Sequence, residues 1–139
     1  MLNFTSNPSS LNLVLYTSRV SAGFPSPADD HIEGKLDLNL HLVRRQASTF
    51  FIRAEGESMK NIGIFSGDLM IVDRSISPQP NDIVIAVVNG ELTVKRLNFK
   101  NNIWILSAEH SYFPDIHLND NDCEVWGVVT HNIRQHCTR

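Results

Sequence analysis

The stretch from residue 54 to residue 73 reads AEGESMKNIGIFSGDLMIVD. A Gly-x-Ser-Met turn comes first, then a Ser-Gly-Asp triplet, then an apolar run. Gly56 and its polar neighbours interrupt the apolar pattern, which predicts a bend after the strand-like residues 49–54. We therefore expect strand, exposed loop and second strand here, with the Ser58 hydroxyl on the bend.

Ser58 is a candidate nucleophile that requires a base. A serine hydroxyl reacts poorly at neutral pH unless another group takes its proton. The best candidate base is Lys95, in the strand-like segment GELTVKRL at residues 90–97. A lysine whose ordinary pKa is about 10.4 must have it lowered by roughly three units to be neutral at pH 7, which costs about 4 kcal/mol. From the residues alone, a turn serine and a solvated lysine remain the plainer alternative.

The other cations near Lys95 are poorer candidates for the base. Arg96 stays protonated because a guanidinium does not titrate in this range. Lys60 is too close to Ser58 in sequence to be buried easily, and Lys100 lies in a polar loop. Strand alternation places Lys95 on one face with Thr93 and Leu97. Because the opposite face also carries apolar residues, the pattern leaves open which face is buried.

Four blocks of the sequence together resemble the LexA/UmuD family of self-cleaving Ser-Lys peptidases. They are AGFPSPA at 22–28, EGESM at 55–59, GDLMIVD at 67–73 and GELTVKRL at 90–97. The resemblance spans roughly residues 20–133 and is of the UmuD-like type. It implies a catalytic Ser58 and Lys95, and cleavage of the bond between Ala22 and Gly23.

The resemblance also implies the surroundings and partners of the dyad. Backbone N–H groups at Ser58 and Met59 would bind the oxyanion, and Gly56, Gly67 and Asp68 would support the loop. No cofactor or metal is expected. The family forms homodimers, is activated by the RecA filament on single-stranded DNA, and after cleavage joins a UmuC-like Y-family polymerase in SOS mutagenesis. Direct sequence-specific DNA binding by the chain itself is not expected.

The strand signals predict a mainly β fold of bent antiparallel sheets. The family resemblance implies that this is the LexA/signal-peptidase-like β fold. Short β-branched and aromatic segments are separated by Pro, Asn, Asp and Gly; they are 49–54, 69–73, 83–88, 91–97, 103–106 and 124–133. Asn89-Gly90 predicts a two-residue hairpin turn between two of them. We expect an N-terminal arm at 1–22 that self-cleavage removes, a linker with a short helix at 23–48, and a peptidase and dimerisation domain at 49–139.

The N-terminal third has weaker signals. Residues 1–22 contain one charged residue, Arg19, and are too few for a helix-turn-helix domain. The apolar patch at 11–16 is either a strand that docks on the body or an unpaired arm. Prolines keep residues 23–27 extended. A short helix is predicted from Asp29 and Asp30 onward, with four apolar residues on one face: Ile32, Leu36, Leu40 and Val43.

Composition excludes several other classes of protein. A net charge of −3 gives no electrostatic reason to bind nucleic acid. Two cysteines, Cys123 and Cys137, are too few for a disulfide framework. Without a membrane-spanning apolar run or a signal-peptide pattern, we expect a cytoplasmic protein with no membrane contact. His131, His136 and Cys137 match no zinc spacing and are expected to form a polar tail.

Two alternative functions remain from the sequence. A signal-peptidase-like protease shares the Ser-Met and Gly-Asp blocks and a downstream lysine, but this chain lacks the membrane anchor of such enzymes. A non-catalytic, dimeric binding module would retain the fold alone. The presence of Ser58, Lys95 and Ala22-Gly23 together argues against that module, because binding without catalysis does not require all three.

Overall fold

The computed structural model describes residues 11–16, 20, 32–109 and 112–139. The chain divides into two compact units, residues 1–44 and residues 45–139. In the first unit, β1 (Asn12–Tyr16) pairs antiparallel with β2 (Ile32–Asp37), and Leu13 lies opposite Leu36. The apolar patch at 11–16 is therefore largely a strand, and its partner lies within its own unit.

The helix predicted in this unit is wrong over most of its length. Residues 32–37 are a strand, and the helix α1 covers only Leu38–Leu42. Gly34 disfavours a helix, while β1 supplies partners for the backbone of an extended chain. The Asp37 side chain accepts a hydrogen bond from the Asn39 N–H at 3.1 Å and so caps the helix at its observed start. Asp29 and Asp30 lie outside the described residues.

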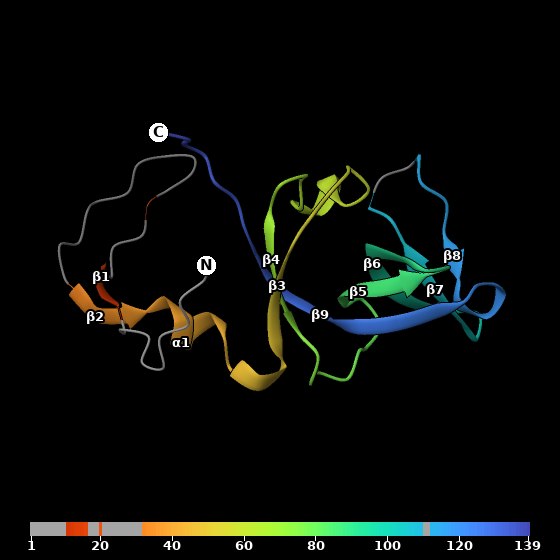
Figure 1. Ribbon diagram of the computed structural model, residues 1–139, viewed down its shortest axis with the longest axis horizontal. Coiled ribbons are helices and arrows are strands. Elements are labelled where there is room, and N and C mark those ends of the chain that lie inside the picture. Colours follow the sequence, from red (N-terminus) through yellow and green to blue (C-terminus); the bar gives the residue numbers. More distant parts are fainter. Residues whose placement is uncertain (1–10, 17–19, 21–31, 110–111) are drawn as a thin grey trace, which may run out of the picture. The chain divides into compact units, whose positions relative to one another are not determined.

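The second unit contains a seven-stranded antiparallel sheet in the order β3-β4-β9-β5-β6-β7-β8 (Figure 1). Its strands are β3 (Thr49–Arg53), β4 (Leu69–Asp73), β5 (Ile83–Val88), β6 (Glu91–Lys100), β7 (Ile103–Ser107), β8 (Ile116–His117) and β9 (Cys123–Ile133). The described residues of this unit also form three short 3-10 turns, at Gln46–Ser48 before β3, at Lys60–Ile62 between β3 and β4, and at Leu118–Asp120 between β8 and β9. The prediction of a mainly β, antiparallel fold with one short helix is confirmed.

The hairpin of β5 and β6 is the clearest case of sequence fixing register. Asn89 and Gly90 both have positive φ values, 50° and 85°, as a type I′ turn requires. Val88 lies opposite Glu91, and the pairing continues to Ile83 opposite Arg96. The turn therefore determines where Lys95 lies along β6, directly opposite Val84.

The long strand β9 joins the two halves of the sheet. It pairs with β4 on one side and with β5 on the other (Figure 1). Gly127 allows the close approach, because a Cβ at this position would lie 2.7 Å from a methyl group of Val72. The register with each neighbour shifts once along β9, which is typical of β-bulges and bends the sheet.

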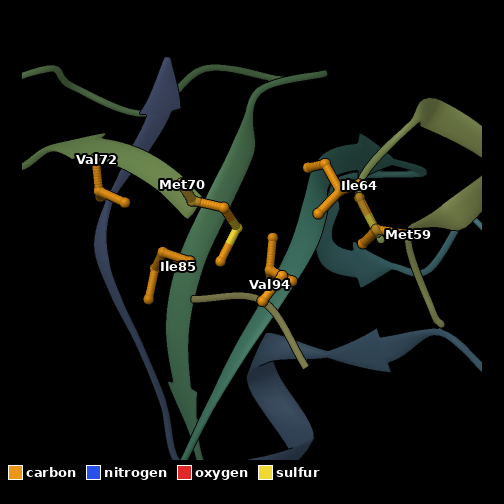
Figure 2. Close-up of a cluster of buried hydrophobic side chains, with 7 residues drawn as sticks. Met59, Ile64, Met70, Val72, Ile85 and Val94 are labelled. Carbon is orange, nitrogen blue, oxygen red and sulfur yellow. The ribbon is translucent and has the colours of Figure 1, made fainter. Parts of the chain in front are cut away.

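Two clusters of buried apolar side chains flank β5. Ile85 belongs to the first, which also contains Met59, Ile64, Met70, Val72 and Val94 (Figure 2). Val84 and Ala86 belong to the second, with Leu97, Leu106 and Val128. Alternate residues of β5 therefore enter different clusters, which explains its unbroken apolar sequence, IVIAVV.

Candidate active site

Residues 54–68 form the loop between β3 and β4 that carries Ser58. The loop is closed at its base by two backbone hydrogen bonds of 2.8 Å, from the Ala54 N–H to the Asp68 carbonyl and from the Gly67 N–H to the Ala54 carbonyl. Gly67 has a φ of 92°, and Gly56, on the other side of the loop, has a φ of 89°. Side chains rarely tolerate this conformation, so both glycines suit the tight path of the chain.

Met59 anchors the loop in the first apolar cluster. Its side chain is 1% exposed and points toward Ile64 and the residues of β4 and β6 (Figure 2). The Met59 carbonyl accepts hydrogen bonds from the N–H groups of Ile62 and Ile64, both at 3.2 Å. Because Met59 directly follows Ser58, this burial restrains the backbone beside the half-buried Ser58 side chain.

Lys95, on β6, contacts the Ser58 side chain. Its Nζ lies 2.9 Å from Ser58 Oγ, 2.9 Å from Thr93 Oγ1 and 3.1 Å from the Val94 carbonyl oxygen. A protonated amine would donate to all three oxygens. A neutral amine has two N–H bonds and one lone pair, so it can donate to Thr93 and Val94 while accepting the Ser58 hydroxyl proton. The same three contacts therefore suit both protonation states.

The surroundings of Lys95 favour the neutral amine. The residue is 8% exposed and makes no ion pair within the described part of the chain. Burial lowers the pKa of Lys95 below its ordinary value, because the charged form loses hydration and gains no counter-charge. The site therefore shifts the pKa of Lys95 in the direction that a lysine base needs.

A hollow of about 250 Å³ lies beside Ser58 and Lys95. Apolar side chains line it from Ile52, Ala54, Met70, Ile85, Leu92 and Val94, and polar ones from Arg53, Glu55, Ser58, Thr93 and Lys95. In the described residues, neither the Ser58 N–H nor the Met59 N–H donates a hydrogen bond to another protein group. Both N–H groups are therefore available to an oxygen bound beside Ser58.

Asp68 sits at the base of the loop and is 3% exposed. Its carboxylate accepts hydrogen bonds from the Phe65 N–H, from Asn132 and from Arg134. The Arg134 guanidinium is the main reason that the pKa of Asp68 falls to about 2, against the opposing effect of burial. The carboxylate is consequently ionised at neutral pH and bonded to the loop on one side and to the C-terminal segment on the other.

The structure brings some of the predicted residues together and leaves others apart. Ser58, Met59 and Lys95 lie together, with Gly56 in the same loop and Gly67 and Asp68 at its base. Ala22 and Gly23 lie outside the described residues, so the predicted bond and the catalytic roles stay predictions. Of the other lysines considered, Lys60 Nζ lies 3.9 Å from Glu57 Oε2. Lys100 is exposed as expected, but it is the last residue of β6 and not part of a loop.

The His/Cys residues of the C-terminal region do not converge in this structure. His131 is exposed on β9, with Nδ1 3.0 Å from Thr130 Oγ1, and His136 and Cys137 are exposed beyond the strand. The sequence did not predict two contacts at the site, between Lys95 and Thr93 and between Arg134 and Asp68. Thr93 had a usable signal, since it shares a strand face with Lys95 two residues away, whereas nothing in the pattern around Arg134 links it to Asp68.

Comparison with known proteins identifies the family of this chain. A model of the family described as Peptidase S24-like matches residues 14–130, which include Ser58, Asp68 and Lys95 but end before Asn132 and Arg134. The chain belongs to the S24-like peptidase family. The site geometry, a serine hydroxyl against a buried and unpaired lysine, agrees with membership of this peptidase family.

Individual S24-like relatives match most of the chain. Protein SamA of Salmonella typhimurium is 50% identical over 116 residues, covering 84% of this chain and 81% of SamA. Protein ImpA of Escherichia coli is 47% identical over 121 residues, covering 87% and 83%. Protein MucA of Escherichia coli is 38% identical over 127 residues, covering 90% and 86%. The predicted resemblance to UmuD-like S24 proteins is therefore confirmed. Across the described residues, every helix is too short to cross a bilayer.

Proposed function

We propose that the chain is a self-cleaving serine peptidase in which Ser58 is the nucleophile and Lys95 the general base. The observation that carries this proposal is the 2.9 Å contact between Lys95 Nζ and Ser58 Oγ, made where the lysine is 8% exposed. Within the described residues no carboxylate pairs with the amine, and burial lowers the pKa of Lys95, which shifts the amine toward the neutral form that a general base requires. Membership of the S24-like family supports the same reaction class.

In the proposed first step, neutral Lys95 takes the Ser58 hydroxyl proton as Oγ attacks the carbonyl carbon of Ala22. Thr93 and the Val94 carbonyl hold the amine by its two N–H bonds, so its lone pair faces Ser58. The carbonyl oxygen becomes an oxyanion, for which the unoccupied N–H groups of Ser58 and Met59 are the nearest donors in sequence. Donors fixed in this way stabilise the charge that develops in the transition state.

In the second step the bond between Ala22 and Gly23 breaks. Protonated Lys95 returns its proton to the nitrogen of Gly23, which leaves as a free amine, and Ala22 remains as an ester on Ser58. Water then hydrolyses the ester with Lys95 again acting as base. The products are residues 1–22 and the chain from Gly23 onward.

The proposed substrate segment suits a small site. Ala22 and Gly23 carry the smallest side chains, and the prolines after them favour the extended backbone that peptidases bind. The hollow beside Ser58 has a volume of about 250 Å³, and both apolar and polar side chains line it. In this proposal residues 1–22 are the arm that is removed, residues 23–48 the linker, and residues 49–139 the peptidase and dimerisation domain.

The biological role that we propose is SOS mutagenesis. The UmuD-like resemblance and the similarity to SamA, ImpA and MucA support it. A RecA filament on single-stranded DNA would promote cleavage of a homodimer. The cleaved form would then act as the accessory subunit of a UmuC-like Y-family polymerase during error-prone synthesis past lesions.

Intact-mass analysis tests the proposal. Purified protein is incubated at neutral and alkaline pH, with and without RecA filament, beside Ser58→Ala and Lys95→Ala variants. We expect a new species that begins at Gly23, promoted by filament or by alkaline pH, and absent from both variants. If the wild-type chain stays whole while the same filament promotes self-cleavage of a known substrate, the peptidase proposal fails and a binding module of the same fold replaces it.

A further inference from the structure

A second polar cluster contacts the Ser58 loop from the C-terminal side of the chain. Its centre is the buried carboxylate of Asp68. Arg134 donates to Oδ1 through Nε at 3.0 Å and to Oδ2 through Nη2 at 2.9 Å. Asn132 donates to Oδ2 at 3.0 Å, and so does the Phe65 N–H, also at 3.0 Å. A carboxylate held by a two-pronged guanidinium and two further donors is fixed in position.

Besides Asp68, Arg134 contacts two further residues of the loop. Its Nη2 also donates to the Gly63 carbonyl at 3.2 Å, and its guanidinium carbon lies 3.6 Å from the centre of the Phe65 ring. Asn132 reaches the same Gly63 carbonyl at 3.1 Å. One guanidinium therefore binds residues 63, 65 and 68, which are three points along the second half of the loop.

The second half of the loop is bonded in turn to the half that carries Ser58. The Ile64 N–H donates to the Met59 carbonyl at 3.2 Å, and the Gly67 N–H donates to the Ala54 carbonyl at 2.8 Å. Restraint at residues 63–68 is thus transmitted to the residue after Ser58 and to the base of the loop. Reaction requires Oγ to stay close to both Lys95 and a scissile carbonyl, and an error of 1 Å costs about a hundredfold in rate.

We propose that Arg134 is a positioning residue for Ser58: by binding Gly63, Phe65 and Asp68 at once, it holds the loop in the conformation that places Ser58 Oγ against Lys95. The inference rests on the proposed function, because it gives Arg134 the role of positioning the proposed nucleophile. Arg134 itself touches neither Ser58 nor Lys95, so it acts through the loop backbone.

The chain offers a matched control at the other end of β4. Asp73 is 4% exposed, and its carboxylate accepts from Ser48 and Ser75 and from Arg45 Nη1 at 3.4 Å. Arg45 and Arg134 therefore each pair with a buried aspartate that flanks the same strand. Only Arg134 binds the Ser58 loop, so replacing either arginine removes an ion pair but only one replacement removes the loop contacts.

The test compares rates of self-cleavage in the full chain for wild type, Arg134→Met, Arg134→Lys and Arg45→Met. Each rate is measured across alkaline pH and at a temperature well below the unfolding midpoint of that variant. We expect Arg134→Met to cleave about ten- to a hundredfold more slowly, with the midpoint of its pH profile unchanged because Lys95 keeps its surroundings. Arg134→Lys should recover part of the rate, and Arg45→Met should stay within about threefold of wild type.

Several outcomes would overturn the inference. A wild-type rate in folded Arg134→Met removes the positioning role while leaving the proposed peptidase intact. An equal loss in Arg45→Met shows that general destabilisation, and not loop position, is being measured. A shifted pH midpoint shows an effect on Lys95 and contradicts action through Ser58.

If Arg134→Met does not fold, Arg134→Lys and Asn132→Ala take its place, each expected to slow cleavage about three- to tenfold. A wild-type chain that never cleaves overturns both proposals together.

Discussion

Lys95 and Arg134 are two cations that contact the Ser58 loop in contrasting surroundings. Lys95 has three neutral oxygen partners and, within the described residues, no carboxylate, so burial lowers its pKa. Arg134 is bonded to the Asp68 carboxylate, which raises the pKa of Arg134 and lowers that of Asp68 to about 2. The difference teaches that burial without a counter-charge shifts a lysine toward its neutral form, whereas a guanidinium beside a carboxylate stays charged and forms a fixed structural contact.

The largest effect should come from removing the ability of Lys95 to lose its proton. Lys95→Arg keeps the positive charge but a guanidinium stays protonated, so self-cleavage should fall at least about a thousandfold. Arg96→Lys is the matched control, because Arg96 is the next residue on β6 and bonds to Glu109 rather than to Ser58. Mass spectrometry of both variants at alkaline pH measures the rates, and a cleaving Lys95→Arg protein would remove lysine from the mechanism.

The next effect should come from giving Lys95 the counter-charge that Arg134 has. Thr93→Asp would place a carboxylate where Thr93 Oγ1 now lies, 2.9 Å from the amine. The pKa of Lys95 should rise, so cleavage at neutral pH should fall about a hundredfold and recover as the pH increases. Thr93→Val removes the hydroxyl without adding charge and should slow cleavage about three- to tenfold at every pH. Identical pH profiles for the two variants would contradict this account.

Removing the counter-charge from Arg134 should cost stability. Asp68→Asn leaves the guanidinium, 31% exposed at its side chain, without its charged partner. We expect the free energy of unfolding to fall by about 2 kcal/mol, as for the loss of hydrogen bonds to a charged group. Urea denaturation measures the change. A variant as stable as wild type would show that the pairing of Asp68 with Arg134 contributes only geometry.

The smallest effect should be a loss of stability in acid. Asp68 and Asp73 both have a folded-state pKa of about 2, below the ordinary value of 3.8. A lowered folded pKa stabilises the protein above the unfolded pKa, and this stabilisation is lost as the pH falls from about 4 toward 2. Thermal melts across this range should show a falling midpoint. The slope should be shallower in Asp68→Asn and in Asp73→Asn, and an unchanged slope in both variants would exclude these two carboxylates as its source.

The sequence anticipates local features of the fold better than its long-range contacts. Alternation and β-branched residues located β3, β4, β5, β6, β7 and β9, because such segments suit a half-buried pleat. Asn89-Gly90 also fixed one register through backbone geometry alone. The error at residues 32–37 has a tertiary cause, since the choice between strand and helix depends on β1, about twenty residues earlier. The two-residue β8 was missed because it is too short to show a period.

The candidate site shows the same limit. Residue chemistry and the family resemblance selected Ser58 and Lys95, and the structure places them 2.9 Å apart across 37 residues of sequence. Arg134 was missed because no local pattern records that a residue just past β9 reaches Asp68, 66 residues earlier. A surface arginine near a polar C-terminal segment looks the same in sequence whether or not it contacts a buried carboxylate.

The place of β9 in the sheet has a consequence for the order of events during synthesis. Ser58 follows β3 and Lys95 lies on β6, and the strand order puts β9 and β5 between β4 and β6. β9 is the last of the described strands in the chain, so it is synthesised after both Ser58 and Lys95. Until β9 pairs with both β4 and β5, the two halves of the sheet lack the neighbour that joins them. If the chain is the self-cleaving peptidase proposed above, this topology delays assembly of Ser58 with Lys95 until β9 is in place.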